Sequence, residues 1–164
     1  MTSDGLVIRV SRGYGQASTR LAAFDEALRA AGVADFNLIR LSSVIPPGST
    51  VTVTGPQDHL IGGFGDALYC VYAVATASEP GAEACAGVGW SRRQDGSGAG
   101  LFAEHSGSSE EEVRGLLRST LGDMSANRGG NFSYEADLIS QVRCESDPVS
   151  AVVVATYRAA GWAT

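Results

Sequence analysis

The chain has 164 residues, of which 44% are hydrophobic and 18% charged, values typical of one globular domain and not of a disordered tail. Its net charge of −6 argues against a surface that follows nucleic-acid phosphates. All 12 basic residues are arginine, so the chain lacks the lysine that carries pyridoxal phosphate and the lysine of a phosphate-binding P-loop.

The first part of the chain predicts a strand followed by a helix. Residues 6–10 form an apolar run, and the glycines at 13 and 15 indicate a loop after it. Ser18 or Thr19 can cap a helix that runs to about residue 31, with Gly32 as its stop signal. Apolar residues recur at helical spacing and predict the buried face of this helix: Leu21, Phe24, Leu28 and Ala31.

The middle of the chain carries the apolar and alternating patterns of β-strands. We expect strands at residues 36–41, 50–54, 67–77, 87–90 and 100–104. The glycine-rich or polar segments 55–65 and 92–98 are expected to form loops.

A second helix begins at Ser108 or Ser109, where Ser109 and Glu112 have the spacing of a capping box. Its apolar positions predict the buried face: Val113, Leu116, Leu117, Leu121 and Met124. Residues 127–130 end the helix, and 132–142 and 149–157 predict the last two strands. The chain is therefore expected to be a single α+β domain over residues 1–164.

Three features indicate a cytoplasmic protein. The three cysteines are widely spaced without a C-x-x-C motif, so we expect free buried thiols. The two histidines lie far apart, and no metal site is expected. The chain shows no signal peptide and no apolar stretch long enough to span a membrane.

The most informative segment is Asn-Leu-Ile-Arg-Leu-Ser-Ser-Val-Ile-Pro-Pro-Gly at residues 37–48. A predicted strand runs directly into Ser42 and Ser43, and two prolines then restrict the backbone. Taken alone, this pattern is also typical of a strand that ends in a polar turn.

This segment resembles the self-cleavage segment of the pyruvoyl-dependent arginine decarboxylases. The resemblance extends to Ala-Phe-Asp-Glu-Ala-Leu at 23–28 and to Gly-Leu-Phe-Ala-Glu at 100–104. It implies a four-layer αββα sandwich and a homotrimer of cleaved units with sites between subunits. It also implies that the Ser43 hydroxyl attacks the carbonyl of Ser42, which divides the chain into residues 1–42 and 43–164.

The resemblance implies that residue 43 becomes a pyruvoyl group, with neither pyridoxal phosphate nor a metal. Its ketone would take the amine of L-arginine, carbon dioxide would leave, and Glu104 would return a proton to give agmatine. Independently, the apolar residues before Glu104 are expected to raise its pKa. The other interpretation is an exposed acid at the end of a strand.

The remaining site residues also come from the resemblance: Asp25 would bind the guanidinium, and Asn37, Ser42 and Val44 would line the substrate site. Helical spacing places Asp25 at the edge of the apolar stripe, with Glu26 nearer to solvent. An ordinary surface pair between Asp25 and Arg29 is the alternative.

Other functions stay open at this level. One is a pyruvoyl enzyme that acts on histidine or another amino acid, and another is an unprocessed, non-catalytic trimeric homologue. A serine hydrolase ranks last, because no Gly-x-Ser-x-Gly motif surrounds Ser43.

Overall fold

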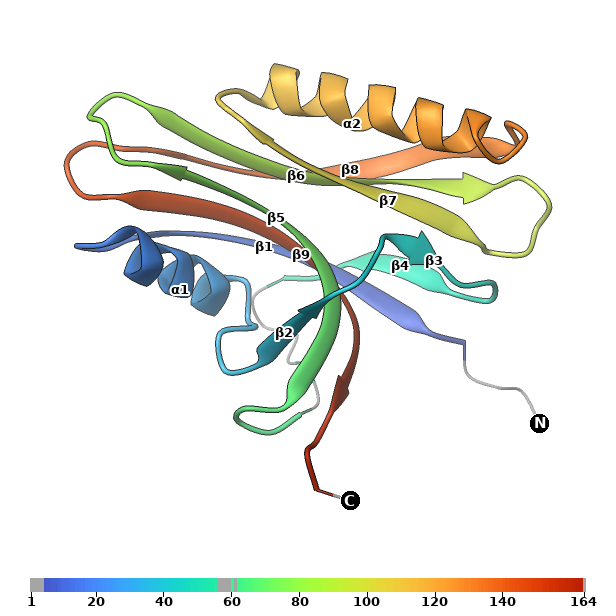
Figure 1. The fold of residues 1–164 in the computed structure, drawn as a ribbon, viewed down its shortest axis with the longest axis horizontal. Coiled ribbons are helices and arrows are strands. Elements are labelled where there is room, and N and C mark those ends of the chain that lie inside the picture. Colours follow the sequence, from blue (N-terminus) through green and yellow to red (C-terminus); the bar gives the residue numbers. More distant parts are fainter. Residues whose placement is uncertain (1–4, 56–59, 61, 164) are drawn as a thin grey trace.

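The computed structural model describes residues 5–55, 60 and 62–163. These residues form two helices and two β-sheets, so the α+β class is confirmed (Figure 1). Part of the loop expected at 55–65 lies outside the described residues, namely 56–59 and 61.

The first sheet has five strands in the order β2-β5-β9-β1-β4. Their bounds are β1 Val7–Gln16, β2 Asn37–Arg40, β4 Thr50–Val53, β5 Ala67–Ala77 and β9 Val149–Ala160. The long strand β9 pairs antiparallel with β5 and β1, while the short edge strands β2 and β4 pair parallel to β5 and β1. The central strands are therefore β5, β9 and β1, which carry most of the apolar residues of this sheet.

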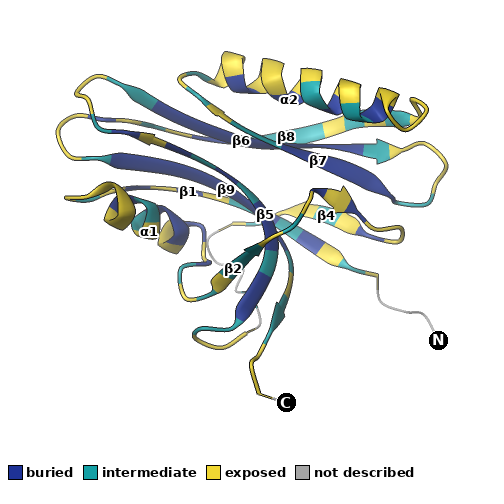
Figure 2. Cartoon of the chain, in the orientation of Figure 1, coloured by how far each residue is buried: buried dark blue, intermediate teal, exposed yellow. Residues whose placement is uncertain are grey.

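The second sheet has four antiparallel strands in the order β3-β7-β6-β8. Their bounds are β3 Val44–Ile45, β6 Glu83–Arg93, β7 Gly100–Gly107 and β8 Phe132–Arg143. One buried cluster contains Val71 and Val153 of the first sheet together with Val88 and Phe102 of the second. The two sheets thus face each other across a common core, and Figure 2 shows the buried residues along the facing strands.

Each helix covers one sheet. Helix α1 (Arg20–Ala30) packs Ala27 and Leu28 against Leu68, Val152 and Val154 of the first sheet. Because side chains alternate along a strand, Val152 and Val154 point away from the core that holds Val153. Helix α2 (Glu110–Ala126) packs against β7, β6 and β8 with three buried apolar side chains: Val113, Leu117 and Leu121.

The ends of α1 are as predicted, and its buried face is confirmed in part, since Leu28 and Ala31 are buried. Thr19 is the N-cap and accepts a hydrogen bond from the Ala22 amide at 3.1 Å. Leu21 was expected in the core and is 78% exposed, whereas Ala23 is buried. The helix approaches the sheet through its small residues, which a count of large apolar side chains does not detect.

The loop expected at residues 13–15 is wrong, because β1 continues through both glycines. A Cβ atom on Gly13 would lie 2.2 Å from the carbonyl oxygen of Ala27, and one on Gly15 would lie 2.6 Å from the Cβ of Glu26. These glycines therefore allow α1 to pack closely on the strand and do not form a turn.

The capping box of α2 is confirmed in part. The Ser109 hydroxyl accepts a hydrogen bond from the Glu112 amide at 3.2 Å. The Glu112 carboxylate accepts from the amide and hydroxyl of Ser108, at 3.0 Å each, and so caps the residue before the one expected. Val113, Leu117 and Leu121 are buried as predicted, whereas Leu116 is 39% exposed.

Several strands are longer than expected. The run at 87–90 extends over 83–93 because β6 pairs with β7 on one side and β8 on the other. Strand β3 lies directly after Ser43, in the segment where a polar turn was one interpretation. The three cysteines are free and buried, as predicted. Neither helix among the described residues is long and apolar enough to cross a membrane.

Candidate active site

The serine pair lies where the chain crosses from one sheet to the other. The Leu41 amide donates to the carbonyl of Cys70 at 2.8 Å, which ties the chain to β5 of the first sheet. The Phe102 amide donates to the carbonyl of Ser43 at 2.8 Å, which ties the chain to β7 of the second sheet. The peptide bond between Ser42 and Ser43 lies between these two attachments, so the sheets hold it from both sides.

Ser43 has a strained backbone. Its φ angle is +74°, and it is the single non-glycine residue with positive φ within the described part of the chain. Such a conformation costs an L-residue on the order of 1–3 kcal/mol and persists only where the surroundings impose it. Ser43 is also 9% exposed, so its hydroxyl is shielded from bulk water.

The Ser43 hydroxyl donates a hydrogen bond to a carboxylate oxygen of Glu104 on β7. Burial raises the pKa of Glu104, while the bond from Ser43 and the positive charge of Arg40 act in the opposite direction. The expected rise in the Glu104 pKa is confirmed. The alternative of an exposed acid at a strand end is wrong, because Glu104 is half-buried and β7 continues to Gly107.

The residues on either side of Ser43 are exposed but differ in their contacts. Val44 pairs with Leu101 in the β3–β7 register, and its carbonyl accepts a hydrogen bond from the Tyr157 hydroxyl at 2.8 Å. Ser42 is exposed and precedes the first attachment to the second sheet. Both residues therefore adjoin the Ser43–Glu104 pair through the backbone.

Arg40 supplies positive charge close to this pair. Its guanidinium donates to the carbonyl of Tyr72 at 2.7 Å and lies 4.5 Å from the centroid of the Tyr72 ring. The cation–π contact and the hydrogen bond hold the guanidinium in place. Its attraction lowers the pKa of Glu104 and so offsets part of the rise caused by burial.

Asp25 does not have the position expected from helical spacing. It is exposed, whereas Glu26 is half-buried, which reverses the predicted order. The expected alternative, a surface pair between Asp25 and Arg29, is also wrong. Arg29 pairs instead with Glu26 and donates to both of its carboxylate oxygens, at 2.9 and 2.5 Å. Glu26 thus forms the local ion pair and leaves the Asp25 carboxylate facing solvent.

Asn37 begins β2, and its side-chain amide donates to the Gly65 carbonyl at 2.8 Å. This bond fixes the turn before β5. Asn37 therefore lies at the start of the strand whose other end leads to Ser43.

The single chain brings Ser43 and Glu104 together but keeps Asp25 apart from them. Glu104 lies on the same face of β7 as Phe102, which points into the core between the sheets. Helix α1, which carries Asp25, covers the opposite face of the five-stranded sheet. Because α1 packs on the face of that sheet that is turned away from the core, the sheet separates Asp25 from Ser43 of the same chain.

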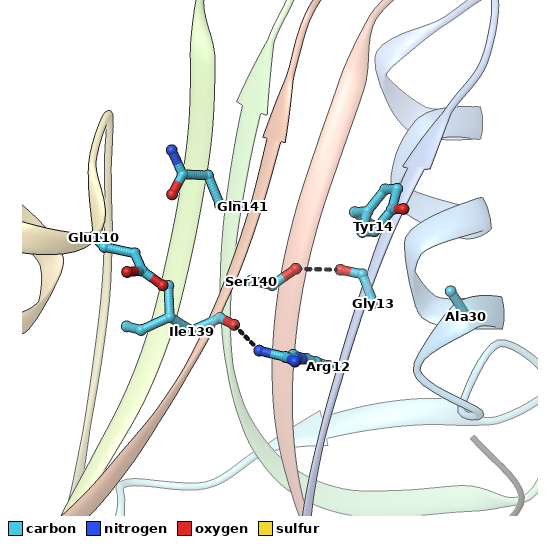
Figure 3. A pocket seen from close by; sticks show the side chains of 8 residues that line it. All are labelled: Arg12, Gly13, Tyr14, Ala30, Glu110, Ile139, Ser140 and Gln141. Atoms are coloured by element: carbon cyan, nitrogen blue, oxygen red, sulfur yellow. Dashed lines mark hydrogen bonds between the residues drawn. The ribbon is translucent and has the colours of Figure 1, made fainter. Parts of the chain in front are cut away.

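A groove of about 740 Å³ lies elsewhere, between β1 of the first sheet and β8 of the second (Figure 3). Its lining includes Arg12 and Tyr14 of β1, Glu110 of α2 and Gln141 of β8. Neither Ser43 nor Glu104 lines it. This groove thus lies apart from the place where the strained serine and the half-buried carboxyl meet.

The family model of the pyruvoyl-dependent arginine decarboxylases matches residues 7–159. The chain belongs to this family. The match includes the strained Ser43, the Glu104 that accepts its hydrogen bond, and both sheets, so the resemblance stated from sequence motifs is confirmed over nearly the whole chain.

Curated relatives carry the same description. A Halobacterium salinarum protein named pyruvoyl-dependent arginine decarboxylase is 44% identical over 97 residues, which cover 59% of this chain and 58% of the relative. Proteins of that description from Archaeoglobus fulgidus and Thermococcus sibiricus are each 31% identical. Their matches cover 76% and 84% of this chain, and 81% and 85% of the relatives. The chain thus matches less than two thirds of the Halobacterium relative but most of the other two.

Sequence reasoning missed two side chains near Ser43 in this family member. Tyr157 continues the alternation of Val153 and Ala155 on β9, which indicates an inward-facing residue but not the carbonyl that it contacts. Arg40 belongs to the recognised segment, yet nothing in its spacing indicates the ring of Tyr72. Both contacts join segments that are far apart in the sequence.

Proposed function

We propose that this chain is a self-processing decarboxylase that converts L-arginine to agmatine and carbon dioxide. The observation that supports it best is the hydrogen bond from the strained, buried Ser43 to Glu104. The proposal includes one domain over residues 1–164 with the four layers α1, five-stranded sheet, four-stranded sheet and α2. The contacts of each helix with its own sheet support this order of layers.

The first proposed step is self-cleavage between Ser42 and Ser43. The Ser43 Oγ atom forms a bond to the carbonyl carbon of Ser42, the C–N bond breaks, and the nitrogen keeps the proton that the hydroxyl loses. Glu104 accepts the hydrogen bond of that hydroxyl and can hold its proton during the transfer. Elimination then removes the Cα proton of residue 43 to a base, forms the Cα=Cβ double bond and breaks the Cβ–Oγ bond, which leaves Ser42 as a carboxylate at the end of the 1–42 chain.

The remaining unsaturated residue 43 takes up water and releases ammonia, which leaves a pyruvoyl group at the start of the 43–164 chain. The surroundings fit this group because the Phe102 amide already holds the carbonyl of residue 43, while Tyr157 holds that of Val44. Cleavage also removes the φ torsion of residue 43, so the strain of a positive φ is released. The group supplies a ketone that takes the substrate amine and accepts electrons as carbon dioxide leaves.

Glu104 has a second proposed role as the acid that protonates the former α-carbon. A carboxyl can donate a proton near neutral pH only if its pKa is raised, and burial of Glu104 has that effect. No pyridoxal phosphate and no metal are part of this proposal.

For the substrate, we assign the guanidinium to Asp25 and the other contacts to Asn37, Ser42 and Val44. The exposed Asp25 carboxylate is not occupied by Arg29 and can accept two hydrogen bonds from a guanidinium. Since the five-stranded sheet separates it from its own Ser43, it would act in the site of a second copy. This geometry is consistent with a homotrimer whose sites lie between subunits. The proposal also includes a cytoplasmic location, which the free, buried cysteines support.

The test combines a denaturing mass spectrum with assays of carbon dioxide and agmatine. We expect two fragments, 1–42 and 43–164, and release of both products from L-arginine in preference to L-histidine. An intact chain in a preparation that decarboxylates arginine would contradict the mechanism. An intact chain without any decarboxylation would instead support a non-catalytic homologue.

A further inference from the structure

Tyr157 reaches from one sheet to the segment that follows Ser43 in the other. Residues 153, 155 and 157 share one face of β9, and Val153 and Ala155 lie in the core between the sheets. At the end of this row the Tyr157 hydroxyl donates to the Val44 carbonyl at 2.8 Å. The bond therefore connects β9 of the first sheet with β3 of the second.

The segment held by Tyr157 has few other hydrogen bonds. Strand β3 has only two residues, and they pair with Leu101 and Gly100 of β7. One further backbone bond, from the Phe102 amide, holds the Ser43 carbonyl. In a strand of two residues, one side-chain hydrogen bond is a large share of all the hydrogen bonds that hold the strand.

The ring of Tyr157 is fixed by aromatic contacts. It lies edge-on to Phe102 with centroids 6.1 Å apart, and Phe102 makes a similar contact with Trp90 at 6.1 Å. Burial and the negative charge of Glu104 both raise the pKa of Tyr157 above its ordinary value. The hydroxyl therefore keeps its proton and remains a donor to Val44.

We propose that Tyr157 is a positioning residue of this enzyme, because its bond to the Val44 carbonyl keeps residue 43 aligned with Glu104. This inference rests on the proposed function. Before cleavage, both neighbours restrain residue 43. After cleavage, residue 43 begins a new chain and keeps a covalent bond only to Val44, and free chain ends ordinarily fray. The contribution of Tyr157 is thus expected to be larger in the cleaved enzyme than in the precursor.

The test is Tyr157→Phe in the full chain, since phenylalanine keeps the ring that packs on Phe102. The matched control is Tyr134→Phe, which removes another half-buried tyrosine hydroxyl that donates to Asp137 at 2.5 Å beside α2. For Tyr157→Phe we expect kcat per cleaved chain to fall by about three- to tenfold, the range for loss of one neutral hydrogen bond, with KM unchanged. The control is expected to keep the wild-type kcat.

A second measurement does not depend on activity. Hydrogen exchange of the cleaved protein should show faster exchange of the residue 45 amide in Tyr157→Phe than in wild type, with no change in Tyr134→Phe. The melting temperature of each variant measures general loss of stability.

The outcomes separate this inference from the function on which it rests. If wild type is cleaved and active while Tyr157→Phe matches it in kcat and in exchange at residue 45, the positioning role is wrong and the function stands. If Tyr157→Phe changes KM as much as kcat, or both tyrosine variants lose kcat equally, the positioning role is also wrong. If wild type is neither cleaved nor active, the proposed function fails and this inference fails with it.

Discussion

Side chains connect the two sheets at several places, and two of these places differ in chemistry. At the Ser43 end, Tyr157 reaches Val44, and Ser43 contacts the half-buried Glu104. At the groove of Figure 3, Arg12 donates to the Ile139 carbonyl at 2.9 Å. There too, the Ser140 hydroxyl donates to the Gly13 carbonyl at 2.8 Å.

The groove is rimmed by solvent-exposed residues, including Tyr14, which is 62% exposed. The Ser43 end holds a non-glycine residue with positive φ and a carboxyl whose pKa is raised by burial. Strain and desolvation both cost free energy, so a fold that retains them has a reason other than stability. Under the proposed function, such costs locate the site better than cavity volume does.

The largest expected effect is that of Ser43→Ala. Without the hydroxyl there is no nucleophile for the Ser42 carbonyl, so the chain stays intact and decarboxylation is lost. A denaturing mass spectrum and a carbon dioxide assay measure the two results. Ser140→Ala is the control. It removes the buried hydrogen bond from the Ser140 hydroxyl to the Gly13 carbonyl at the groove, and it should leave cleavage complete.

Glu104→Gln is expected to come next. Glutamine keeps the size of the side chain but cannot donate a proton from a carboxyl group, and loss of a general acid lowers kcat by about 10²- to 10⁴-fold. The measurement is kcat per cleaved chain, with the cleaved fraction taken from the mass spectrum. A kcat within threefold of wild type would mean that another group supplies the proton.

Asp25→Asn tests the residue that we assign to the substrate guanidinium and that lies apart from Ser43 of the same chain. Loss of a charge-assisted pair with the guanidinium should raise KM for arginine by about 10- to 100-fold while cleavage remains complete. Glu26→Gln is the control, because Glu26 forms an exposed pair with Arg29 and such pairs contribute little. Unchanged arginine kinetics in Asp25→Asn would remove the main support for the substrate assignment.

The pH dependence of stability provides a smaller and more specific test. The comparison uses two uncleaved proteins, Ser43→Ala and Ser43→Ala with Glu104→Gln. Because burial raises the pKa of Glu104 above 4.5, the unfolded chain releases this proton at a lower pH than the folded chain does.

The neutral carboxyl therefore supports folding fully below pH 4.5, and that contribution is lost as the pH rises through the folded-state pKa. As the pH rises through this range, the melting temperature of the protein with Glu104→Gln should rise relative to that of Ser43→Ala alone. Above this range the difference between the two melting temperatures should stay constant. A constant difference from pH 4 upward would show that the pKa of Glu104 is not raised.

The smallest expected effect is that of Arg12→Ala in the groove. The arginine is exposed, and the loss of one bond to the Ile139 carbonyl should cost about 1 kcal/mol or less of the free energy of unfolding. Chain cleavage should be unchanged. A block in cleavage would show that the contacts at the groove and those at the Ser43 end are not independent, which would contradict the comparison of the two regions.

Local signals predicted the parts of the fold that depend on neighbours in the chain. The Thr19 and Ser109 caps are correct because a cap bonds to a backbone amide three residues away. The glycines at 13 and 15 led to the wrong prediction of a loop, since their role depends on α1 packing against β1. Leu21 was wrongly predicted to be buried for a related reason, because the helix meets the sheet through alanine.

For the site, the order of residues in the serine–proline segment was specific enough to indicate the family. Together with the segment at 100–104, the resemblance suggested Ser43 and Glu104 as site residues, and these two side chains are in contact. The sequence by itself also excluded lysine-based chemistry, because the absence of a residue type does not depend on folding. These conclusions need only the identity and order of residues.

The tertiary structure alone decided which groups meet. The contacts of Ser43 with Glu104, of Tyr157 with Val44 and of Arg40 with Tyr72 each join residues separated by 32 to 113 positions. The φ of Ser43 and the pKa of Glu104 are likewise set by the two sheets that enclose them. Strain and desolvation are properties of packing between distant segments, so no local pattern in the chain determines them.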